Sequence, residues 1–251
     1  MVSRNELRDR YRQVVERIAA AAGRSGRRAG DILMVAVTKN ASPDQIRQLI
    51  ELGHQDLGEN RVQHLQQRAA MTEEFVQRHH SLSSSRKAEV PERIRWHMIG
   101  HLQRNKVKMV LPLVKLIHSV DSLRLAEEMQ SQAAHNDSEV ELLIQVSTAG
   151  EESKFGIAPP AISHLIDQMQ TMFNLKVRGL MVIAPYSDNP EDARPCFERA
   201  AELFHDMRRQ NVGGESFNIL SMGMSGDFEV AIECGANIVR IGRALFGEAE
   251  A

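Results

Sequence analysis

Asp31-Ile32-Leu33-Met34-Val35-Ala36-Val37-Thr38-Lys39 is the stretch of sequence that decides the fold. Residues 32–37 form an unbroken apolar run, which Gly30 precedes and the turn residues Ser42 and Pro43 follow. An apolar run of this length between turn signals favours a strand buried on both faces, as in a parallel sheet. The run leads into Lys39, whose amine either reaches solvent at the strand end or faces a ligand above the sheet.

The composition excludes several classes of protein. The chain has 251 residues, 42% of them hydrophobic and 25% charged, with a formal net charge of −2, so neither nucleic acid nor an anionic membrane is an expected partner. Two cysteines, Cys196 and Cys234, indicate no disulfide framework and no zinc cluster. The charged first residues do not resemble a secretory signal, and no apolar run approaches about 20 residues. We therefore expect a cytoplasmic protein.

Strand and helix patterns alternate along the whole chain. The predicted strands cover residues 32–37, 56–58, 94–99, 114–120, 140–146, 177–183, 217–220 and 237–241. The predicted helices between them cover residues 43–52, 61–78, 105–111, 123–134, a segment from 159, 190–210 and 227–233. Eight strand–helix units in about 250 residues predict an α/β fold, a single (β/α)8 TIM barrel, with an open doubly wound sheet as the alternative. No linker divides residues 1–251, so we expect one domain.

Two segments lie outside this alternation. Apolar residues at helical spacing predict an extra helix over residues 3–22 that packs on the barrel, with Ser3 and Glu6 in capping-box spacing and Gly23 at its end. Residues 79–92 contain a low-complexity serine run, which predicts a mobile surface loop. The pair His79-His80 in that segment is weak as a metal signal, and we predict no metal site.

The strand ends of such a barrel would bring polar side chains to one end. They are Lys39, Asn60, His101, Ser119, Ser147, Tyr186, Ser221, Ser225 and Arg240. The loops after the seventh and eighth strands are rich in small and hydroxyl residues, namely Ser221, Gly223, Ser225, Gly226 and Gly242. Barrels commonly bind phosphate at these loops through backbone N–H groups, although glycine there can also serve only the backbone conformation.

Arg240 lies inside the apolar strand of residues 238–241, where an always-charged guanidinium needs a partner. A ligand heteroatom and an internal salt bridge both satisfy that need. Lysine forms Schiff bases with carbonyl compounds, and burial or a nearby cation lowers its pKa. A lysine, an arginine and a phosphate cradle together indicate a phosphorylated carbonyl ligand, which fits a barrel aldolase and a pyridoxal phosphate (PLP) protein equally.

Seven motifs in order along the chain resemble those of the pyridoxal phosphate homeostasis proteins. They are Val35-Ala36-Val37-Thr38-Lys39, Gly58-Glu59-Asn60-Arg61-Val62-Gln63, residues 96–106 (WHMIGHLQRNK), residues 117–122 (IHSVDS), residues 178–181 (RGLM), residues 220–225 (LSMGMS) and residues 239–247 (VRIGRALFG). The resemblance covers nearly the whole chain. It implies a barrel of the alanine racemase N-terminal type that binds pyridoxal 5'-phosphate.

The resemblance also assigns roles to residues by motif position. Lys39 would hold PLP as a Schiff base, and Arg240 would face the pyridine nitrogen. The phosphate would lie against Ser225, Gly242 and the backbone of Arg243. Ser221 and Met222 would lie close by, and Asn60 would lie near the ring. Family members commonly carry threonine at the position of Arg243, so a hydroxyl contact to the phosphate would be lost here.

The arginine bears on whether the protein is a carrier or an enzyme. A cation beside the pyridine nitrogen disfavours its protonation and weakens the ring as an electron sink. About ten residues follow the eighth strand, too few for the second domain that supplies the opposing tyrosine in alanine racemases. Tyr186 could stand in, although a tyrosine at a strand end more often packs or donates a hydrogen bond.

We therefore predict a monomeric PLP-binding protein without catalytic residues of its own, which buffers the cofactor or delivers it to PLP-dependent apo-enzymes and so affects amino-acid metabolism indirectly. The alternative is a single-domain, racemase-like PLP enzyme. A phospho-sugar aldolase is the third hypothesis, and it predicts no tight binding of free PLP.

Overall fold

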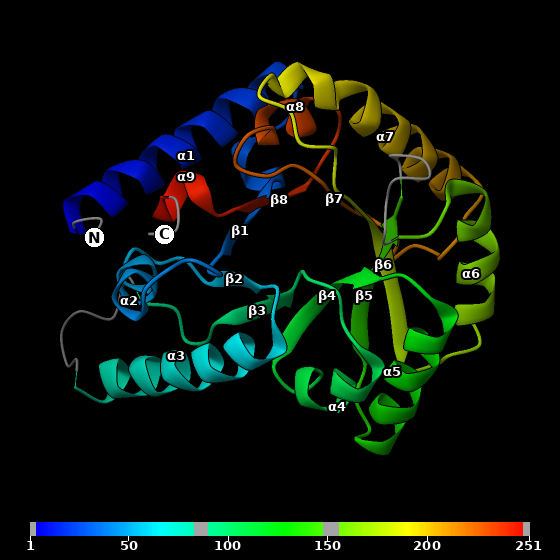
Figure 1. Cartoon of the computed structure of the whole chain (residues 1–251), viewed down its shortest axis with the longest axis horizontal. Helices are drawn as coiled ribbons and strands as arrows, with labels where there is room; N and C mark the ends of the chain where they lie inside the picture. Colours follow the sequence, from blue (N-terminus) through cyan, green and yellow to red (C-terminus); the bar gives the residue numbers. More distant parts are fainter. Residues whose placement is uncertain (1–3, 83–89, 148–155, 248–251) are drawn as a thin grey trace.

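Eight parallel strands close into a barrel in chain order in the computed structural model, which describes residues 4–82, 90–147 and 156–247 (Figure 1). The strands are β1 (Leu33–Val37), β2 (Asp56–Glu59), β3 (Arg95–Met98), β4 (Val114–Val120), β5 (Val140–Val146), β6 (Leu175–Val182), β7 (Ile219–Ser221) and β8 (Ile238–Ile241). The barrel closes where β1 pairs with β8, in a register that sets Val35 against Arg240. This confirms the predicted (β/α)8 barrel.

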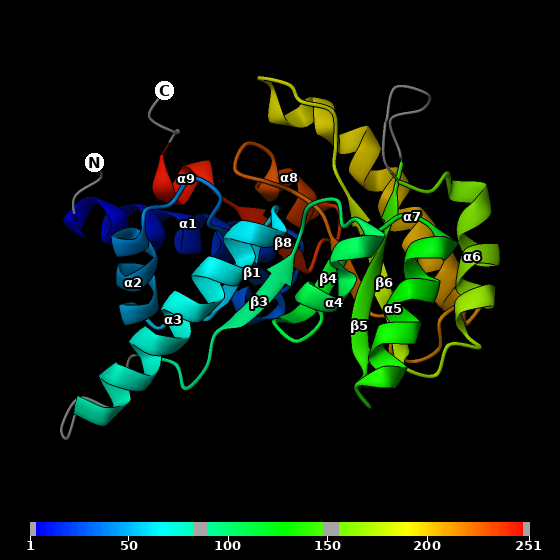
Figure 2. The same cartoon turned by 60° about the horizontal axis from the view of Figure 1, so that its bottom comes forward.

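Helices surround the strands. The α-helices are α1 (Arg4–Arg24), α2 (Pro43–Glu51), α3 (Val62–Leu82), α4 (Val107–Val110), α5 (Leu123–His135), α6 (Ile162–Met169), α7 (Arg194–Arg209), α8 (Phe228–Glu233) and α9 (Arg243–Phe246). The 3-10 helices are η1 (Ala29–Asp31), η2 (Arg104–Lys106), η4 (Pro159–Ala161) and η5 (Pro190–Ala193). Figure 2 shows α9 at the end toward which the strands point. We call this end of the barrel, where the strands have their carboxyl ends, the mouth.

Apolar side chains fill two separate spaces. The barrel interior holds a small cluster of buried side chains, which are Val35, Leu116, Leu143, Met181 and Ile238. The larger core lies between the outer faces of the strands and the helices. Successive residues of a strand point to opposite faces, so the strands bury apolar side chains on both sides, as their sequence predicts. Polar residues on the inner face are therefore enclosed by the barrel.

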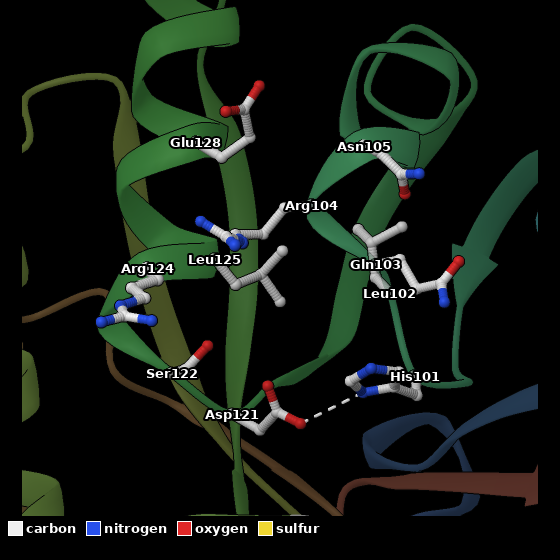
Figure 3. A pocket seen from close by; sticks show the side chains of 10 residues that line it. All are labelled: His101, Leu102, Gln103, Arg104, Asn105, Asp121, Ser122, Arg124, Leu125 and Glu128. Atoms are coloured by element: carbon white, nitrogen blue, oxygen red, sulfur yellow. Dashed lines mark hydrogen bonds and ion pairs between the residues drawn. The ribbon is translucent and has the colours of Figure 1, made fainter.

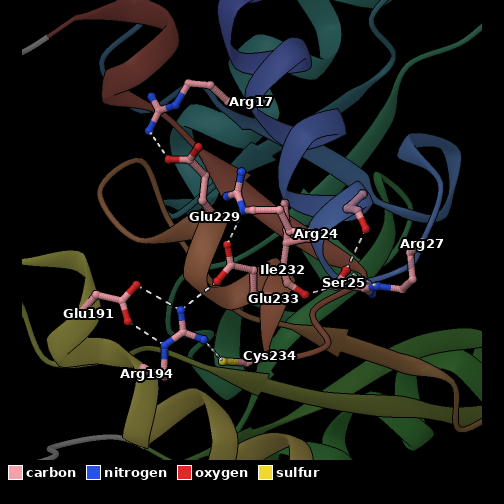
Figure 4. Close-up of polar contacts among 11 residues, drawn as sticks. Arg17, Arg24, Ser25, Arg27, Glu191, Arg194, Glu229, Ile232, Glu233 and Cys234 are labelled. Carbon is pink, nitrogen blue, oxygen red and sulfur yellow. Dashed lines mark hydrogen bonds and ion pairs between the residues drawn. The ribbon is translucent and has the colours of Figure 1, made fainter.

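The extra N-terminal helix α1 packs against α8 and α9 (Figure 1). Leu7, Val14 and Ile18 are buried on its inner face. On its polar side Arg17 pairs with Glu229 at 2.7 Å and Arg24 pairs with Glu233 at 2.7 Å (Figure 4). The helix thus has an apolar contact face with ion pairs at its rim, and it continues one residue beyond the predicted end at Gly23.

Glu233 also contacts the segment that opens α7. Arg194 donates to Glu233 at 2.7 Å and to Glu191 at 2.6 and 3.0 Å, and its Nη1 lies 3.7 Å from the sulfur of Cys234 (Figure 4). Burial raises the pKa of the Cys234 thiol despite this cation. A raised pKa disfavours the reactive thiolate, in keeping with a packing role for this cysteine.

The structure corrects three predicted boundaries. Residues 79–82 belong to α3 instead of a loop, and residues 83–89 of the predicted mobile segment lie outside the described residues. The seventh strand begins at Ile219 instead of Phe217, because Phe217 ends a turn and its ring stacks on Phe204 with 5.3 Å between centroids. The short helix α9 follows Gly242, where the sequence indicated only a loop.

Candidate functional site

Lys39 lies one residue beyond Thr38 at the end of β1, where its side chain is exposed at the mouth. Val35, Val37 and Lys39 alternate along the chain, so the lysine continues the inner face of the strand. The turn after it is closed by the amide of Ala41, which donates to the carbonyl of Thr38 at 2.7 Å. Ser42 then caps α2 together with Gln45. The structure therefore places the predicted lysine at the rim of the barrel on a short, capped turn.

A buried ion pair fixes this turn from below. The Glu59 side chain is fully buried, and its Oε1 accepts hydrogen bonds from the Thr38 hydroxyl and from Arg68 of α3. Arg68 also donates to the carbonyl of Thr38 and, at 2.9 Å, to that of Ala41. Both carbonyls flank Lys39, so one guanidinium ties the lysine turn to α3. The sequence analysis assigned no role to Glu59 or Arg68.

Arg240 is 4% exposed and lies near the carboxyl ends of β6 and β7. Its Nη1 donates to Ser221 Oγ at 2.7 Å and its Nη2 donates to the carbonyl of Val182 at 2.9 Å. No carboxylate of the described residues lies within 4 Å of it, so these residues offer no internal salt bridge. Burial lowers the pKa of Arg240 to about 10, although Asp227 opposes this shift. At neutral pH the guanidinium is still charged, and it is an enclosed cation beside the mouth.

A line of hydrogen bonds runs from Arg240 through the barrel interior. Ser221 Oγ lies 3.0 Å from His118 Nδ1, and His118 Nε2 lies 3.0 Å from His97 Nδ1. His97 Nε2 lies 3.1 Å from Oδ1 of Asp56, which begins β2 at the end of the barrel opposite the mouth. We call these five residues the histidine chain. They link the mouth to the opposite end of the barrel, and the sequence analysis identified neither histidine.

Burial lowers the pKa of His118 well below its usual value, and the neighbouring His97 and Arg240 lower it further. Burial alone would raise the pKa of Asp56, but hydrogen bonds from His97 and Arg95 outweigh it and hold that pKa below its usual range. Asp56 is thus a carboxylate and His118 a neutral imidazole over the physiological range.

The loops after β7 and β8 converge on Ser225. Its Oγ accepts from the amide of Gly242 at 3.1 Å and from that of Ala244 at 3.2 Å. Gly223 has a φ of 91°, and a Cβ on it would lie 2.5 Å from Cβ of Ala231, so this turn requires glycine. Amides at the start of α9 therefore gather around one small hydroxyl, an arrangement that suits an anion.

Three further predicted residues lie around this cradle. Met222 is fully buried and its amide donates to the carbonyl of Ile238 at 3.1 Å, so it supports the loop from inside. The Arg243 side chain is exposed, and its guanidinium carbon lies 6.0 Å from the ring centre of Tyr186. The Tyr186 ring is 79% exposed and its hydroxyl donates to Asp188 at 2.9 Å. Tyr186 is thus held at the surface by its own loop.

Asn60 follows β2 at the mouth. Its Oδ1 is buried and has no hydrogen-bond partner among the described residues. A Cβ on Gly100 would overlap the backbone of Asn60, so glycine allows the ends of β2 and β3 to approach closely. A buried amide oxygen without a partner is costly, which makes Asn60 a candidate contact for a ligand.

His101 and Ser119 do not point into the same space as Arg240. Ser119 donates to the carbonyl of Gly100 at 2.6 Å, a contact that joins two strand ends. His101 Nδ1 lies 3.2 Å from Asp121 Oδ2 beside a hollow of about 750 Å³ between η2 and α5 (Figure 3). Arg104 points across this hollow toward α5 (Figure 3). The side chains of His101 and Ser119, both predicted to lie at the mouth, therefore make contacts that join neighbouring strand ends.

The described part of the chain contains no group of three metal-ligating side chains. None of its helices has the length and apolar character that crossing a membrane requires.

Comparisons with known proteins agree with this geometry. Residues 27–250 match the family model described as alanine racemase, N-terminal domain. A pyridoxal phosphate homeostasis protein of Aquifex aeolicus is 41% identical over 96% of this chain and 97% of its own. A crystal structure of an unknown protein from Bifidobacterium adolescentis has a TM-score of 0.85 and 34% identity, over 97% of this chain and 95% of that one. PipY of Synechococcus elongatus with PLP bound has a TM-score of 0.75 and 29% identity, over 93% of this chain and 100% of that one.

The chain is thus a (β/α)8 barrel of the alanine racemase N-terminal class. Within that class it belongs to the family of pyridoxal phosphate homeostasis proteins.

Proposed function

We propose that this protein binds pyridoxal 5'-phosphate at the mouth and serves in the homeostasis of this cofactor as a carrier, without efficient turnover of its own. The observation that carries the proposal is the enclosed guanidinium of Arg240, which donates to Ser221 and Val182 and lies within 4 Å of no carboxylate in the described part of the chain. A pyridine nitrogen that keeps its lone pair is an acceptor that suits such a donor.

The residues at the mouth fit this cofactor. PLP supplies an aldehyde that an amine can attack, and Lys39 is the exposed amine at the rim. We assign to Lys39 the Schiff-base lysine and to Arg240 the contact with the ring nitrogen. Asn60, with its buried and unpartnered Oδ1, is assigned to the side of the ring.

The phosphate is assigned to the cradle around Ser225. Its hydroxyl lies at hydrogen-bond distance from the amides of Gly242 and Ala244, and the amide of Arg243 lies between them in the chain. Ser225 Oγ accepts from both amides, so its hydroxyl proton can be donated to an anion bound beside it. Ser221 and Met222 support the cradle from the barrel side, since Ser221 contacts Arg240 and Met222 is buried. The exposed Arg243 guanidinium adds positive charge nearby.

Arg240 also argues for a carrier. Because the guanidinium stays charged beside the ring nitrogen, protonation of that nitrogen is disfavoured. A pyridine without this proton withdraws electrons weakly, so chemistry that needs a stabilised carbanion is slow. Tyr186, the candidate for an opposing acid–base group, is bonded to Asp188 and 79% exposed. A candidate proton donor that is held by its own loop and exposed to water suits storage and release better than turnover.

The test is the visible absorbance of the protein mixed with PLP, followed by borohydride reduction and peptide mass mapping. We expect wild type to show a new band and a reduced adduct on the Lys39 peptide. Lys39→Ala should lose both, whereas Lys108→Ala, which removes an exposed lysine of α4, should keep both. An adduct spread over several surface lysines would contradict the assignment, as would a band that survives in Lys39→Ala.

Carrier and enzyme are then separated by two further measurements. Wild type loaded with PLP is mixed with a PLP-dependent apo-enzyme, and the return of that enzyme's activity is followed against free PLP at equal concentration. In parallel, single amino acids are incubated with the loaded protein and their chirality is measured. Transfer without racemisation supports the carrier, and racemisation that Lys39→Ala abolishes supports the racemase-like enzyme. A monomeric state and a cytoplasmic location stay part of this proposal, and sedimentation and cell fractionation test them.

A further inference from the structure

When both imidazoles are neutral, the donor and the acceptor of every hydrogen bond in the histidine chain are determined. A carboxylate accepts hydrogen bonds but donates none, so the proton between His97 Nε2 and Asp56 must belong to the histidine. The other nitrogen of a neutral His97, Nδ1, is then bare and accepts from His118 Nε2 at 3.0 Å. His118 Nδ1 is bare in turn, and it accepts from the hydroxyl of Ser221 at 3.0 Å.

This order determines what Ser221 offers to Arg240. The single hydroxyl proton of Ser221 is used toward His118, inside the barrel. A lone pair of the Ser221 oxygen therefore faces the guanidinium, and Nη1 of Arg240 donates to this oxygen at 2.7 Å. Each of the four bonds has a donor and an acceptor, and the chain runs from a cation at the mouth to an anion at the opposite end.

The surroundings hold the two rings in place. His118 is fully buried and His97 is 2% exposed, and their ring centres lie 5.2 Å apart at an angle of 65°. Apolar side chains fill the rest of the interior, among them Leu116 and Leu143. The charged and titratable groups that face the pair are Asp56 of β2, Arg95 of β3 and Arg240 of β8, with His54 behind Asp56. A ring in this enclosure has no water to replace a lost partner.

We propose that His118 and His97 are positioning residues of the cofactor site: through Ser221 they hold the Arg240 guanidinium in the place and orientation in which it meets the ligand ring. This inference rests on the proposed function, because it concerns the same site. It extends that site from the loops at the mouth to Asp56 at the opposite end of the barrel. Neither histidine touches the ligand, and both act through the serine.

The first test needs no cofactor. Nitrogen-15 NMR of the full chain, labelled at histidine, reports which ring nitrogen carries the proton. We expect His118 to be neutral at pH 7, with its proton on the Nε2 that faces His97. The His118 signals should move in Ser221→Ala, which removes the hydroxyl. A proton on Nδ1 of His118, or a charged His118, would overturn the directed chain and the proposal with it.

The second test measures PLP affinity, by titration of the absorbance of bound PLP, in matched variants. His118→Phe keeps an aromatic ring, although a larger one, and removes both nitrogens. We expect the Kd to rise about tenfold, because Ser221, the partner of the charged Arg240, loses its hydrogen bond to His118. His118→Asn keeps an acceptor near the position of Nδ1, so its Kd should rise no more than about threefold. Leu143→Ala opens a cavity in the same interior and removes none of the hydrogen-bonding groups of the histidine chain, so its Kd should rise less than that of His118→Phe.

A double variant of His118 and Ser221 distinguishes a positioning role of His118 from a general disturbance of the barrel interior. If His118 acts only through Ser221, Ser221→Ala together with His118→Phe binds PLP no more weakly than the worse single variant. Equal loss in His118→Phe and Leu143→Ala, or losses that multiply in the double variant, would overturn the proposal. If His118→Phe does not fold, His118→Asn against Ser221→Ala gives the same comparison. Absence of PLP binding by wild type would refute the proposed function. The NMR result would still show whether the hydrogen bonds of the histidine chain run in the inferred direction.

Discussion

Replacement of Arg68 by methionine tests whether the buried pair with Glu59 holds the lysine turn. The change keeps an unbranched apolar stem and removes a guanidinium that contacts Glu59 and the carbonyls of Thr38 and Ala41. Glu59 is fully buried, so its carboxylate would lose its cationic partner with no water to replace it. Removing one partner of a buried ion pair costs about 3–5 kcal/mol.

The lower end of that range applies, because the Arg68 side chain is 18% exposed. A loss of about 3 kcal/mol in a chain of this size lowers Tm by about 6–12 °C. Thermal and urea unfolding followed by circular dichroism measure the loss. Arg78→Met is the matched control on the same helix, because the pair of Arg78 with Glu74 is exposed on both sides and should contribute less than about 1 kcal/mol.

The same variant should weaken trapping of PLP on Lys39 by borohydride, because the turn that carries the lysine loses its support from α3. In a double-mutant cycle with Glu59→Gln, the double variant should lose less stability than the sum of the two single losses, with a coupling energy of about 1 kcal/mol or more. An Arg68→Met protein that melts within about 2 °C of Arg78→Met would refute the reasoning. The reasoning would also be refuted if Arg68→Met lost the full expected stability and its trapping on Lys39, corrected for the folded fraction, were unchanged.

Three further predictions follow from burial and backbone geometry. Burial lowers the pKa of both His54 and His118, so below about pH 6.5 the unfolded chain binds protons that the folded chain does not bind. The free energy of unfolding is therefore highest above this pH and falls below it by up to about 1.4 kcal/mol per pH unit for each histidine. Urea midpoints at pH 7 and pH 5 measure the difference. Gly179→Ala places a Cβ against a carbonyl of β7 at a φ of 148° and should abolish soluble expression, whereas Gly23→Ala, with open space around it, should be tolerated. Glu233→Gln removes the carboxylate that Arg24 and the half-buried Arg194 share. We expect it to cost less than about 1 kcal/mol of stability, and high salt should remove the same contribution in wild type.

The sequence predicted the strands well where β-branched and other apolar residues dominate a short segment. The fourth and fifth strands match residue for residue, because residues 114–120 and 140–146 are mostly apolar and carry only a few polar side chains. The placement of Lys39, Ser221 and Arg240 followed from the same runs, since each stands at or near the end of one. The direct contact between Ser221 and Arg240 is a consequence of neighbouring strand ends.

The rest of the site depends on contacts that local patterns do not contain. His97 and His118 each lie among apolar residues of a strand, which is also the pattern of an isolated core histidine. The partner that gives His118 its role is Ser221, 103 residues away in the sequence. Glu59 and Arg68 meet only after α3 has packed on the barrel. In the sequence Glu59 directly follows the predicted strand of residues 56–58, and nothing in that local pattern indicates that its partner lies on the next helix.

The pairing of β1 with β8 has a consequence for how the protein is made. Val35 and Arg240 are neighbours in the barrel but about 200 residues apart in the chain. At a synthesis rate of about 5–20 residues per second, the lysine leaves the ribosome about 10–40 s before the arginine. A nascent chain therefore cannot form the complete proposed cofactor site until β8 has emerged, and an interrupted translation product retains Lys39 without Arg240.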